Sequence, residues 1–227
     1  MLRVSVIIPT LNEEAVIRAA IDSARQAGAD EIIVADGGST DRTVEIASVE
    51  TTVVRSETAA RAAQQNAGAA VATGDVLLFL HADCELHING ITEMRERCEL
   101  SSDFVAGCFY QRIDLEGWRF RMTESGNQWR VRLLRWAYGD QGIFVAAEAF
   151  RDLGGFPDVK FLEDLLLMKS LKGRGSFLLL SSPLKVSARR WQRRGLFRQT
   201  FRNWAIVIAA QFGASPNWLA RFYPNDR

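Results

Sequence analysis

The sequence predicts an α/β fold in which a mainly parallel sheet is flanked by helices. Through the first 80 residues, β-branched apolar runs alternate with helical segments, as in "RVSVIIP" and the segment that follows it. Such alternation implies right-handed crossovers and parallel neighbouring strands. The chain has 227 residues, of which 48% are hydrophobic, enough to bury one substantial core. With no long linker or internal repeat, we expect a single domain over residues 1–227.

The elements follow one another regularly in the first half of the chain. Strands are predicted at 3–9, 31–36, 51–56 and 75–80, with helices at 12–28, 39–48 and 57–73 between them. In the second half, strands are predicted at 103–114, 141–146 and 176–188, and helices at 118–137, 148–156, 161–175 and 195–213. Asn12 is the predicted N-cap of the first helix and Gly28 its end.

Composition argues against several classes of function. The net charge of +1 gives no indication of a nucleic-acid partner. Three cysteines without a CxxC pair are typical of reduced thiols in the cytoplasm. The segment before the first strand does not resemble a signal peptide, and the apolar run 205–210 is too short to span a bilayer. Neither GxGxxG nor GxxxxGK[ST] occurs, which argues against an NAD enzyme and a Walker-type ATPase.

Ligands of parallel sheets bind beyond the carboxyl ends of the strands, so the polar residues found there are candidates. In "IVADGGSTD", Asp36 could accept a hydrogen bond from a base or hydroxyl, and the two glycines allow close approach of a ligand. A tight turn with an N-cap is the alternative. Arg61 opposes the dipole near a helix start, which favours a ligand or an acid as its partner; a solvated surface arginine is the alternative.

The stretch "LLFLHADCEL" places one carboxylate, Asp83, after a buried strand. Mg²⁺ and Mn²⁺ prefer oxygen ligands and complete their shells with water and phosphate, so Asp83 could hold such an ion, with His81 as a second ligand or donor. A zinc site that adds Cys84 and His87 is less favoured, because neighbouring residues on a strand alternate sides.

Three further stretches lie in the second half. Asp140 and Gln141 in "YGDQG" form either a turn or contacts to a polyhydroxylated substrate. Glu163 and Asp164 at a helix start are either ordinary dipole partners or a general base. The basic stretch "SARRWQRRG" (187–195) could clamp a diphosphate, or could contact anionic lipid or a partner.

Taken together, these stretches resemble family-2 glycosyltransferases. "SVIIPTLNEE", "IVADGGSTDRT", "RAAQQNAG", "LLFLHAD", "GGF…LEDLLL" and "RRW" occur in the order of that family and span almost the whole chain. The family consists of inverting, nucleotide-sugar-dependent enzymes of the GT-A fold, a Rossmann-like sheet. "HAD" replaces the family's DxD, and the compact chain resembles a small soluble bacterial subgroup.

The resemblance implies roles by position. The nucleotide would contact Pro9, Thr10, Asn12, Glu13, Asp36, Gly38 and Arg61. Mg²⁺ or Mn²⁺ would be held by Asp83 with His81, and Asp164 would be the catalytic base beside Glu163. The diphosphate and acceptor would meet Asp140, Gln141, Arg189, Arg190 and Trp191. Because Leu162 precedes the acidic pair, the pKa of the base is expected to be raised.

The resemblance also implies an organisation and partners. Residues 1–100 would form the nucleotide-sugar-binding half, 101–195 the acceptor and catalytic half, and 196–227 a C-terminal helix. The donor would be a nucleoside-diphospho-sugar, usually a UDP-sugar, and the acceptor hydroxyl could belong to a small molecule, a glycan or a lipid-linked sugar. The terminal helix could pack in the core, form a homodimer or touch the inner face of the membrane from the cytoplasm. A nucleotidyltransferase and a non-catalytic sugar-nucleotide-binding protein remain alternatives, the latter because of His81.

Overall fold

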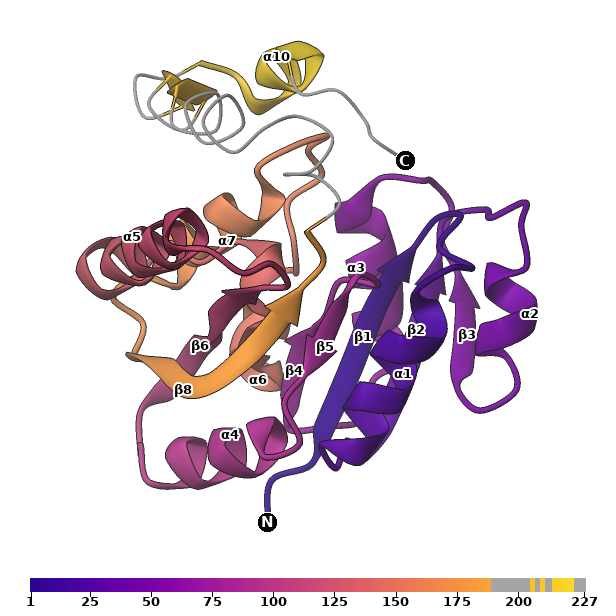
Figure 1. Ribbon diagram of the computed structural model, residues 1–227, viewed down its shortest axis with the longest axis horizontal. Coiled ribbons are helices and arrows are strands. Elements are labelled where there is room, and N and C mark those ends of the chain that lie inside the picture. Colours follow the sequence, from indigo (N-terminus) through magenta and orange to yellow (C-terminus); the bar gives the residue numbers. More distant parts are fainter. Residues whose placement is uncertain (189–204, 207–208, 211–213, 223–227) are drawn as a thin grey trace.

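An eight-stranded sheet with helices on both faces forms the protein (Figure 1). The computed structural model describes residues 1–188, 205–206, 209–210 and 214–222. The strands are β1 (Val4–Thr10), β2 (Glu31–Asp36), β3 (Thr52–Arg55), β4 (Val76–Phe79), β5 (Cys84–Leu86), β6 (Phe104–Ile113), β7 (Ile143–Ala146) and β8 (Ser176–Val186). The α-helices are α1 (Ile17–Gln26), α2 (Thr43–Ala47), α3 (Arg61–Val71), α4 (Gly90–Glu99), α5 (Trp118–Leu134), α6 (Ala147–Asp152), α7 (Glu163–Leu171) and α10 (Pro216–Leu219), with 3₁₀ turns η1 (Gly139–Gln141) and η2 (Ala220–Phe222).

The sheet has the order β3-β2-β1-β4-β7-β6-β8-β5. Its first four strands are parallel, as are β6 and β8, which confirms the predicted α/β class. β7 runs antiparallel to both of its neighbours, and β5 is antiparallel to β8 at the edge. Strand β5 and helix α4 were not predicted, because their sequences are short or weakly periodic.

The start of α1 differs from the prediction. The helix begins at Ile17, and Asn12 lies in the preceding loop with φ of 55°. Its side-chain oxygen accepts a 2.8 Å hydrogen bond from the N–H of Thr40 in a neighbouring loop. The prediction of Asn12 as the N-cap is therefore wrong, because its amide serves a contact between loops. Gly28, with φ of 90°, does end the segment as predicted.

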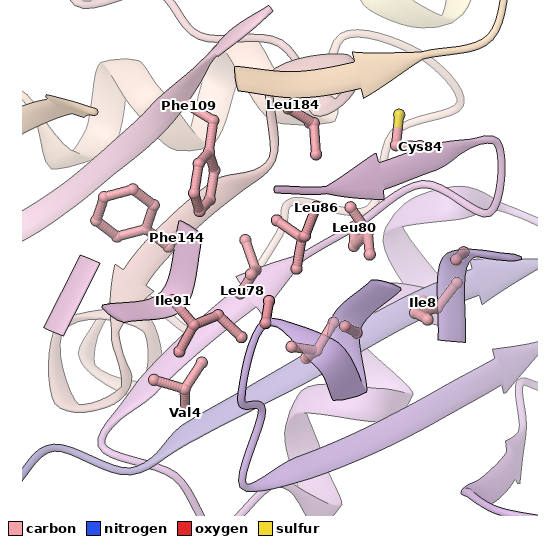
Figure 2. Packing of buried hydrophobic residues seen from close by; sticks show 14 of the residues in the cluster. Val4, Ile8, Leu78, Leu80, Cys84, Leu86, Ile91, Phe109, Phe144 and Leu184 are labelled. Atoms are coloured by element: carbon pink, nitrogen blue, oxygen red, sulfur yellow. The ribbon is translucent and has the colours of Figure 1, made fainter. Parts of the chain in front are cut away.

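Two apolar layers bury the faces of the sheet. Val6 and Ile8 face the layer formed with α1 and α4, whereas Ile7 faces the layer formed with α3, α6 and α7. Figure 2 shows the first layer, in which the rings of Phe109 and Phe144 pack edge to face with their centroids 5.7 Å apart. This alternation follows from the period of two along a strand. Burial of both faces leaves the strand ends as the places where polar side chains can gather.

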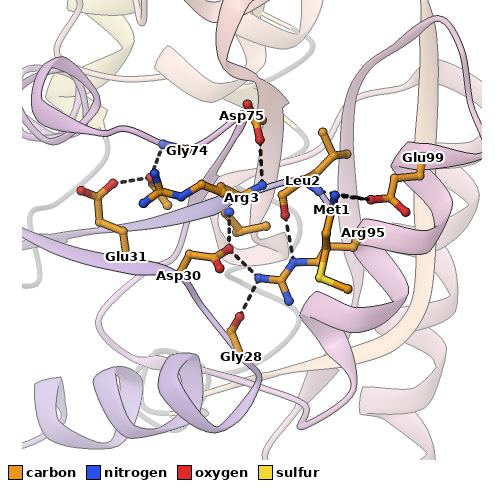
Figure 3. A network of polar contacts seen from close by, with 12 residues as sticks. Met1, Leu2, Arg3, Gly28, Asp30, Glu31, Gly74, Asp75, Arg95 and Glu99 are labelled. Carbon is orange, nitrogen blue, oxygen red and sulfur yellow. Dashed lines mark hydrogen bonds and ion pairs between the residues drawn. The ribbon is translucent and has the colours of Figure 1, made fainter.

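The amino end of the parallel strands is fastened by polar contacts (Figure 3). Arg95 of α4 donates to the carbonyls of Leu2 and Gly28 and pairs with Asp30. Asp30 in turn accepts a 2.7 Å hydrogen bond from the N–H of Val4, where β1 begins. These contacts close the end of the sheet opposite the predicted site. Among the described residues, no helix has both the length and the apolar composition of a membrane span.

Candidate active site

The predicted nucleotide residues meet at the carboxyl ends of β1 and β2. Thr10 is paired with Asp36 in the parallel register, and Pro9 with Ala35. The Asp36 carboxylate accepts hydrogen bonds from the N–H of Gly38 at 2.8 Å and from the N–H of Ser39. Gly38 has φ of 98°, a conformation that favours glycine. The turn at residues 36–39, called the Asp36 turn below, is therefore held in shape by its own hydrogen bonds without a ligand.

The loop after β1 is joined to the loop after β2. Asn12 donates its N–H to the hydroxyl of Ser39, and Glu13 donates its N–H to the hydroxyl of Thr43 at 2.8 Å. The structure thus brings together two segments that are more than 20 residues apart in the sequence, one with Thr10, Asn12 and Glu13 and the other with Asp36 and Gly38.

Buried polar atoms beside this turn belong to the predicted Thr10 and to two residues that the sequence analysis missed, Ser56 and Gln64. Among the described residues, the hydroxyls of Thr10 and Ser56 and Oε1 of Gln64 are buried with no hydrogen-bond partner. Ser56 follows β3, and its N–H donates to the Asp36 carbonyl. Gln64 donates its amide to the Thr10 carbonyl. Buried polar atoms without partners cost free energy, so this cluster indicates a place where a polar ligand supplies the missing bonds.

Asp164 is the second residue of α7 and is 8% exposed. Its Oδ2 accepts a 2.8 Å hydrogen bond from the N–H of Gly139, while its Oδ1 has no partner among the described residues. Burial raises the pKa of Asp164 to about 7, with a further contribution from the neighbouring Glu163. Arg61 and the Gly139 hydrogen bond act in the opposite direction. The expected raised pKa is confirmed.

Arg61 connects the two halves of the site. It is the first residue of α3, and its guanidinium lies 3.8 Å from Oε1 of Glu163. The expectation that this arginine meets an acid is confirmed. Because Glu163 is almost fully buried, the ion pair links the nucleotide side of the sheet to the start of α7.

His81 and Asp164 both lie against Gly139. A Cβ added to Gly139 would collide with Nε2 of His81 and would lie 2.7 Å from Oδ2 of Asp164. His81 follows β4 and is 6% exposed. Three separate parts of the chain therefore converge here, and only a glycine leaves room for both side chains. The sequence analysis did not select Gly139, although its position before Asp140 was a usable signal.

Asp83 lies in the turn between β4 and β5. It is partly exposed, and its carbonyl accepts a 3.0 Å hydrogen bond from the N–H of Ser187. Cys84 is buried in the hydrophobic core and His87 is exposed, so the structure does not support the zinc alternative. Within the described part of the chain, no three His, Cys, Asp or Glu side chains gather as a metal site.

Asp140 and Gln141 belong to a hydrogen-bond network under the site. Gln111 donates to Oδ2 of Asp140 at 2.9 Å, and Arg130 donates to Oε1 of Gln141 at 2.7 Å. Asn127 bridges the two parts, since it donates to Gln111 and accepts from Arg130. Gln141 is fully buried, so it positions η1 rather than facing open solvent.

A cavity of about 900 Å³ includes in its lining Glu85, which is two residues beyond Asp83. It is lined by Glu85, Leu86, His87, Arg112, Ile113, Asp114, Leu115, Glu116, Gly117, Trp118, Arg121, Pro183 and Lys185. Among these lining residues, Lys185 forms ion pairs with Glu85 at 3.1 Å and with Asp114 at 3.4 Å. Arg189, Arg190, Trp191 and most of the predicted helix 196–227 lie outside the described residues.

Solved structures share this architecture. S. aureus TarS residues 1–349 in complex with UDP has a TM-score of 0.66 at 18% identity, over 82% of this chain and 60% of that one. Glucosyl-3-phosphoglycerate synthase from Mycobacterium tuberculosis, with Mn²⁺, UDP and glucosyl-3-phosphoglycerate, has a TM-score of 0.62 at 21% identity, over 80% of this chain and 70% of that one. At these identities the likeness establishes the fold.

Sequence comparison gives the family. A PGL/p-HBAD biosynthesis glycosyltransferase of Mycobacterium bovis (strain BCG / Pasteur 1173P2) is 44% identical over 92 residues, which are 37% of this chain and 36% of that protein. The chain thus matches about a third of the length of that relative. The model of glycosyl transferase family 2 matches residues 5–152, which include the Asp36 turn, His81, Asp83 and Gly139. The resemblance noted in the sequence is confirmed: this chain belongs to glycosyl transferase family 2.

Proposed function

We propose that this protein transfers a sugar, with inversion, from a nucleoside-diphospho-sugar to an acceptor hydroxyl, with Asp164 as the general base. One observation carries the proposal. Asp164 is a buried carboxyl with a pKa of about 7, fixed at one oxygen by the Gly139 N–H and without a described partner at the other. A base poised near neutral pH with one open oxygen can accept the proton of a bound hydroxyl.

The nucleotide is proposed to be UDP. Thr10 and Ser56 are backbone neighbours of Asp36 on the adjacent strands, and donors and acceptors of a base or ribose could complete the hydrogen bonds of their unpartnered hydroxyls. Both solved neighbours described above were determined with UDP, which supports this choice. Arg61 starts α3 between this turn and Glu163, a suitable position for contacting a phosphate.

The proposed chemistry is a single displacement. The acceptor hydroxyl gives its proton to Oδ1 of Asp164 while its oxygen bonds to the anomeric carbon, and the bond from that carbon to the diphosphate oxygen breaks. Glu163 is engaged by Arg61 and is therefore not assigned as a second nucleophile. By analogy with glycosidases, one base without a nucleophilic carboxylate gives inversion.

Mg²⁺ or Mn²⁺ fits the site if the nucleotide supplies most of its ligands. Asp83 is a partly exposed oxygen donor of the kind these ions prefer, and within the described part of the chain it does not belong to a group of three or more His, Cys, Asp or Glu side chains that could hold a metal by themselves. One of the solved neighbours holds Mn²⁺ together with UDP. When bound, the cation would offset the negative charge that builds on the leaving diphosphate. Asp83 and His81 would hold it.

The acceptor is proposed to enter the cavity that is lined in part by Glu85 and Trp118. Glu85 lies on β5 two residues beyond Asp83, and its side chain points away from the core because Cys84 and Leu86 on either side of it are buried. The lining mixes cations, acids and Trp118, which suits a hydroxylated compound; small-molecule, glycan and lipid-linked acceptors remain open.

A non-catalytic sugar-nucleotide-binding protein is the alternative, favoured by His81 at the position of the first acid. The family membership disfavours the nucleotidyltransferase alternative.

We would screen nucleoside diphosphates and their sugars by thermal shift with and without Mn²⁺, since a ligand that binds the folded state raises the melting temperature. UDP release from the best UDP-sugar, with water as acceptor, then tests catalysis. Release of UDP together with a sugar of inverted anomeric configuration supports the proposal. Binding of the UDP-sugar without release of UDP supports the non-catalytic alternative.

A further inference from the structure

Helix α5 carries four large apolar side chains on a side that faces solvent, although its Val131 is buried in the core. Trp118, Met122, Trp129 and Leu133 are 66%, 64%, 60% and 73% exposed. Their spacings of four, seven and four residues place them within an arc of about 60° on an α-helix. Four large apolar side chains in one exposed row are uncommon on a protein surface unless something covers them. We refer to these four residues as the α5 stripe.

The side of α5 that faces the sheet is held largely by polar groups. Glu124 is fully buried, accepts a 2.7 Å hydrogen bond from the N–H of Ile113 and pairs with Arg121 at 3.1 Å. Asn127 and Arg130 belong to the network beneath η1. A surface helix normally shows the reverse arrangement, with apolar residues inward. The α5 stripe is therefore not required to attach the helix to the sheet.

The exposed charges on α5 itself that flank the α5 stripe are all positive, whereas the acids that share a cavity with Trp118, such as Glu116, lie outside the helix. Arg119 lies over the Trp118 ring at 5.5 Å, and Arg132 lies over the Trp129 ring at 6.0 Å. Both arginines are exposed, as is Arg135 directly after the helix. The acid within α5 is the buried Glu124. Tryptophan and leucine flanked by arginine are the side chains that settle at a headgroup boundary, and arginine attracts anionic phosphates.

We propose that α5 lies on an anionic lipid surface, with the α5 stripe in the headgroup region and its arginines on lipid phosphates. A second copy of the chain is a poorer occupant, because a self-complementary contact would set Arg119 and Arg132 of both copies against each other without exposed acids on the helix. The proposal differs from a contact through the C-terminal segment and does not depend on the catalytic assignment. Trp118 also lines the cavity assigned to the acceptor.

The test is co-sedimentation of the full chain with vesicles. Vesicles of phosphatidylcholine and phosphatidylglycerol in equal parts are compared with vesicles of phosphatidylcholine alone. We expect binding to the anionic vesicles, weakened by salt. Trp129→Ser with Leu133→Ser should reduce the bound fraction roughly tenfold, and so should Arg119→Glu with Arg132→Glu. Val49→Ser with Leu100→Ser is the matched control, since these apolar residues are exposed elsewhere, and it should bind like the unmodified chain.

Thermal unfolding of each variant confirms that it is folded before its binding is compared. If the unmodified chain fails to sediment with anionic vesicles, the proposal is wrong. It is also wrong if folded α5 variants bind as well as the control, because another segment then makes the contact. Light scattering that shows a dimer dissociated by Trp129→Ser with Leu133→Ser, without vesicle binding, would identify a second copy as the occupant.

Discussion

The backbone N–H of Gly139 donates a 2.8 Å hydrogen bond to Oδ2 of Asp164, and His81 packs against the same glycine. The proposed base is thus oriented by a short turn rather than by its own helix. The turn is itself held by a network of the buried Gln111 and the partly buried Asn127 and Arg130, so the position of the carboxyl depends on residues that are assigned no contact with the substrate.

Gly139→Ala should lower the rate of UDP release roughly 100-fold, because its Cβ would push apart His81 and Asp164. UDP affinity should change little, since the nucleotide turn lies on another loop. Gly126→Ala is the control: a Cβ there meets nothing within 4 Å, and the substitution should leave the rate unchanged. Equal rates for both variants would show that the glycine has no role in positioning the base.

Asp164→Asn should reduce sugar transfer or donor hydrolysis by at least about 100-fold, because the amide cannot accept the proton. Binding of UDP, measured by calorimetry, should be retained. Glu163→Gln is the companion variant; it should weaken UDP binding through Arg61 and have a smaller effect on the maximal rate. Full activity of Asp164→Asn would remove this residue from the base role.

The rate should rise with pH through about 7. Burial raises the pKa of Asp164 to about that value, and the base must be deprotonated to act. The measurement is the pH profile of kcat/KM for UDP release. A profile that stays flat between pH 5 and 8 would contradict the assignment.

The free energy of unfolding should change with pH in the direction opposite to the rate, since the contribution of Asp164 falls as the pH rises. The folded protein binds the Asp164 proton more tightly than the unfolded chain, whose carboxyl has a pKa near 3.8. The contribution of Asp164 to the free energy of unfolding is fully present below pH 3.8 and is lost as the pH rises through about 7. Asp164→Asn should therefore raise the melting temperature relative to the unmodified protein more at pH 8 than at pH 5. An equal difference at both pH values would show that Asp164 does not carry this dependence.

Arg130→Met should lower the free energy of unfolding by about 3 kcal/mol, since it leaves Gln141 and Asn127 without their buried donor. Arg132→Met, on the exposed side of the same helix, should change it by less than about 0.5 kcal/mol. Urea unfolding measures both. Similar values for the two variants would show that the network under η1 contributes little to stability.

The sequence predicted the parts of the fold that depend on local periodicity. β1, β2 and β4 are continuous apolar runs, and the turn after β2 carries glycines that mark it. The strand β7 was predicted, but its antiparallel direction was not, because that direction is set by pairing with strands far away in the sequence. Similarly, Asp164 was visible as an acid at a helix start, whereas its approach to Gly139 and His81 arises only from tertiary packing.

The central claim is that the Asp36 turn and the Asp83 turn form one site for a nucleotide and a cation, and calorimetry with UDP and Mn²⁺ tests it most directly. We predict that Mn²⁺ alone gives no binding heat, that UDP binds more tightly when Mn²⁺ is present, and that Asp83→Ala removes this enhancement. Tight binding of Mn²⁺ without nucleotide, or UDP binding that is indifferent to both Mn²⁺ and Asp83→Ala, would contradict the account.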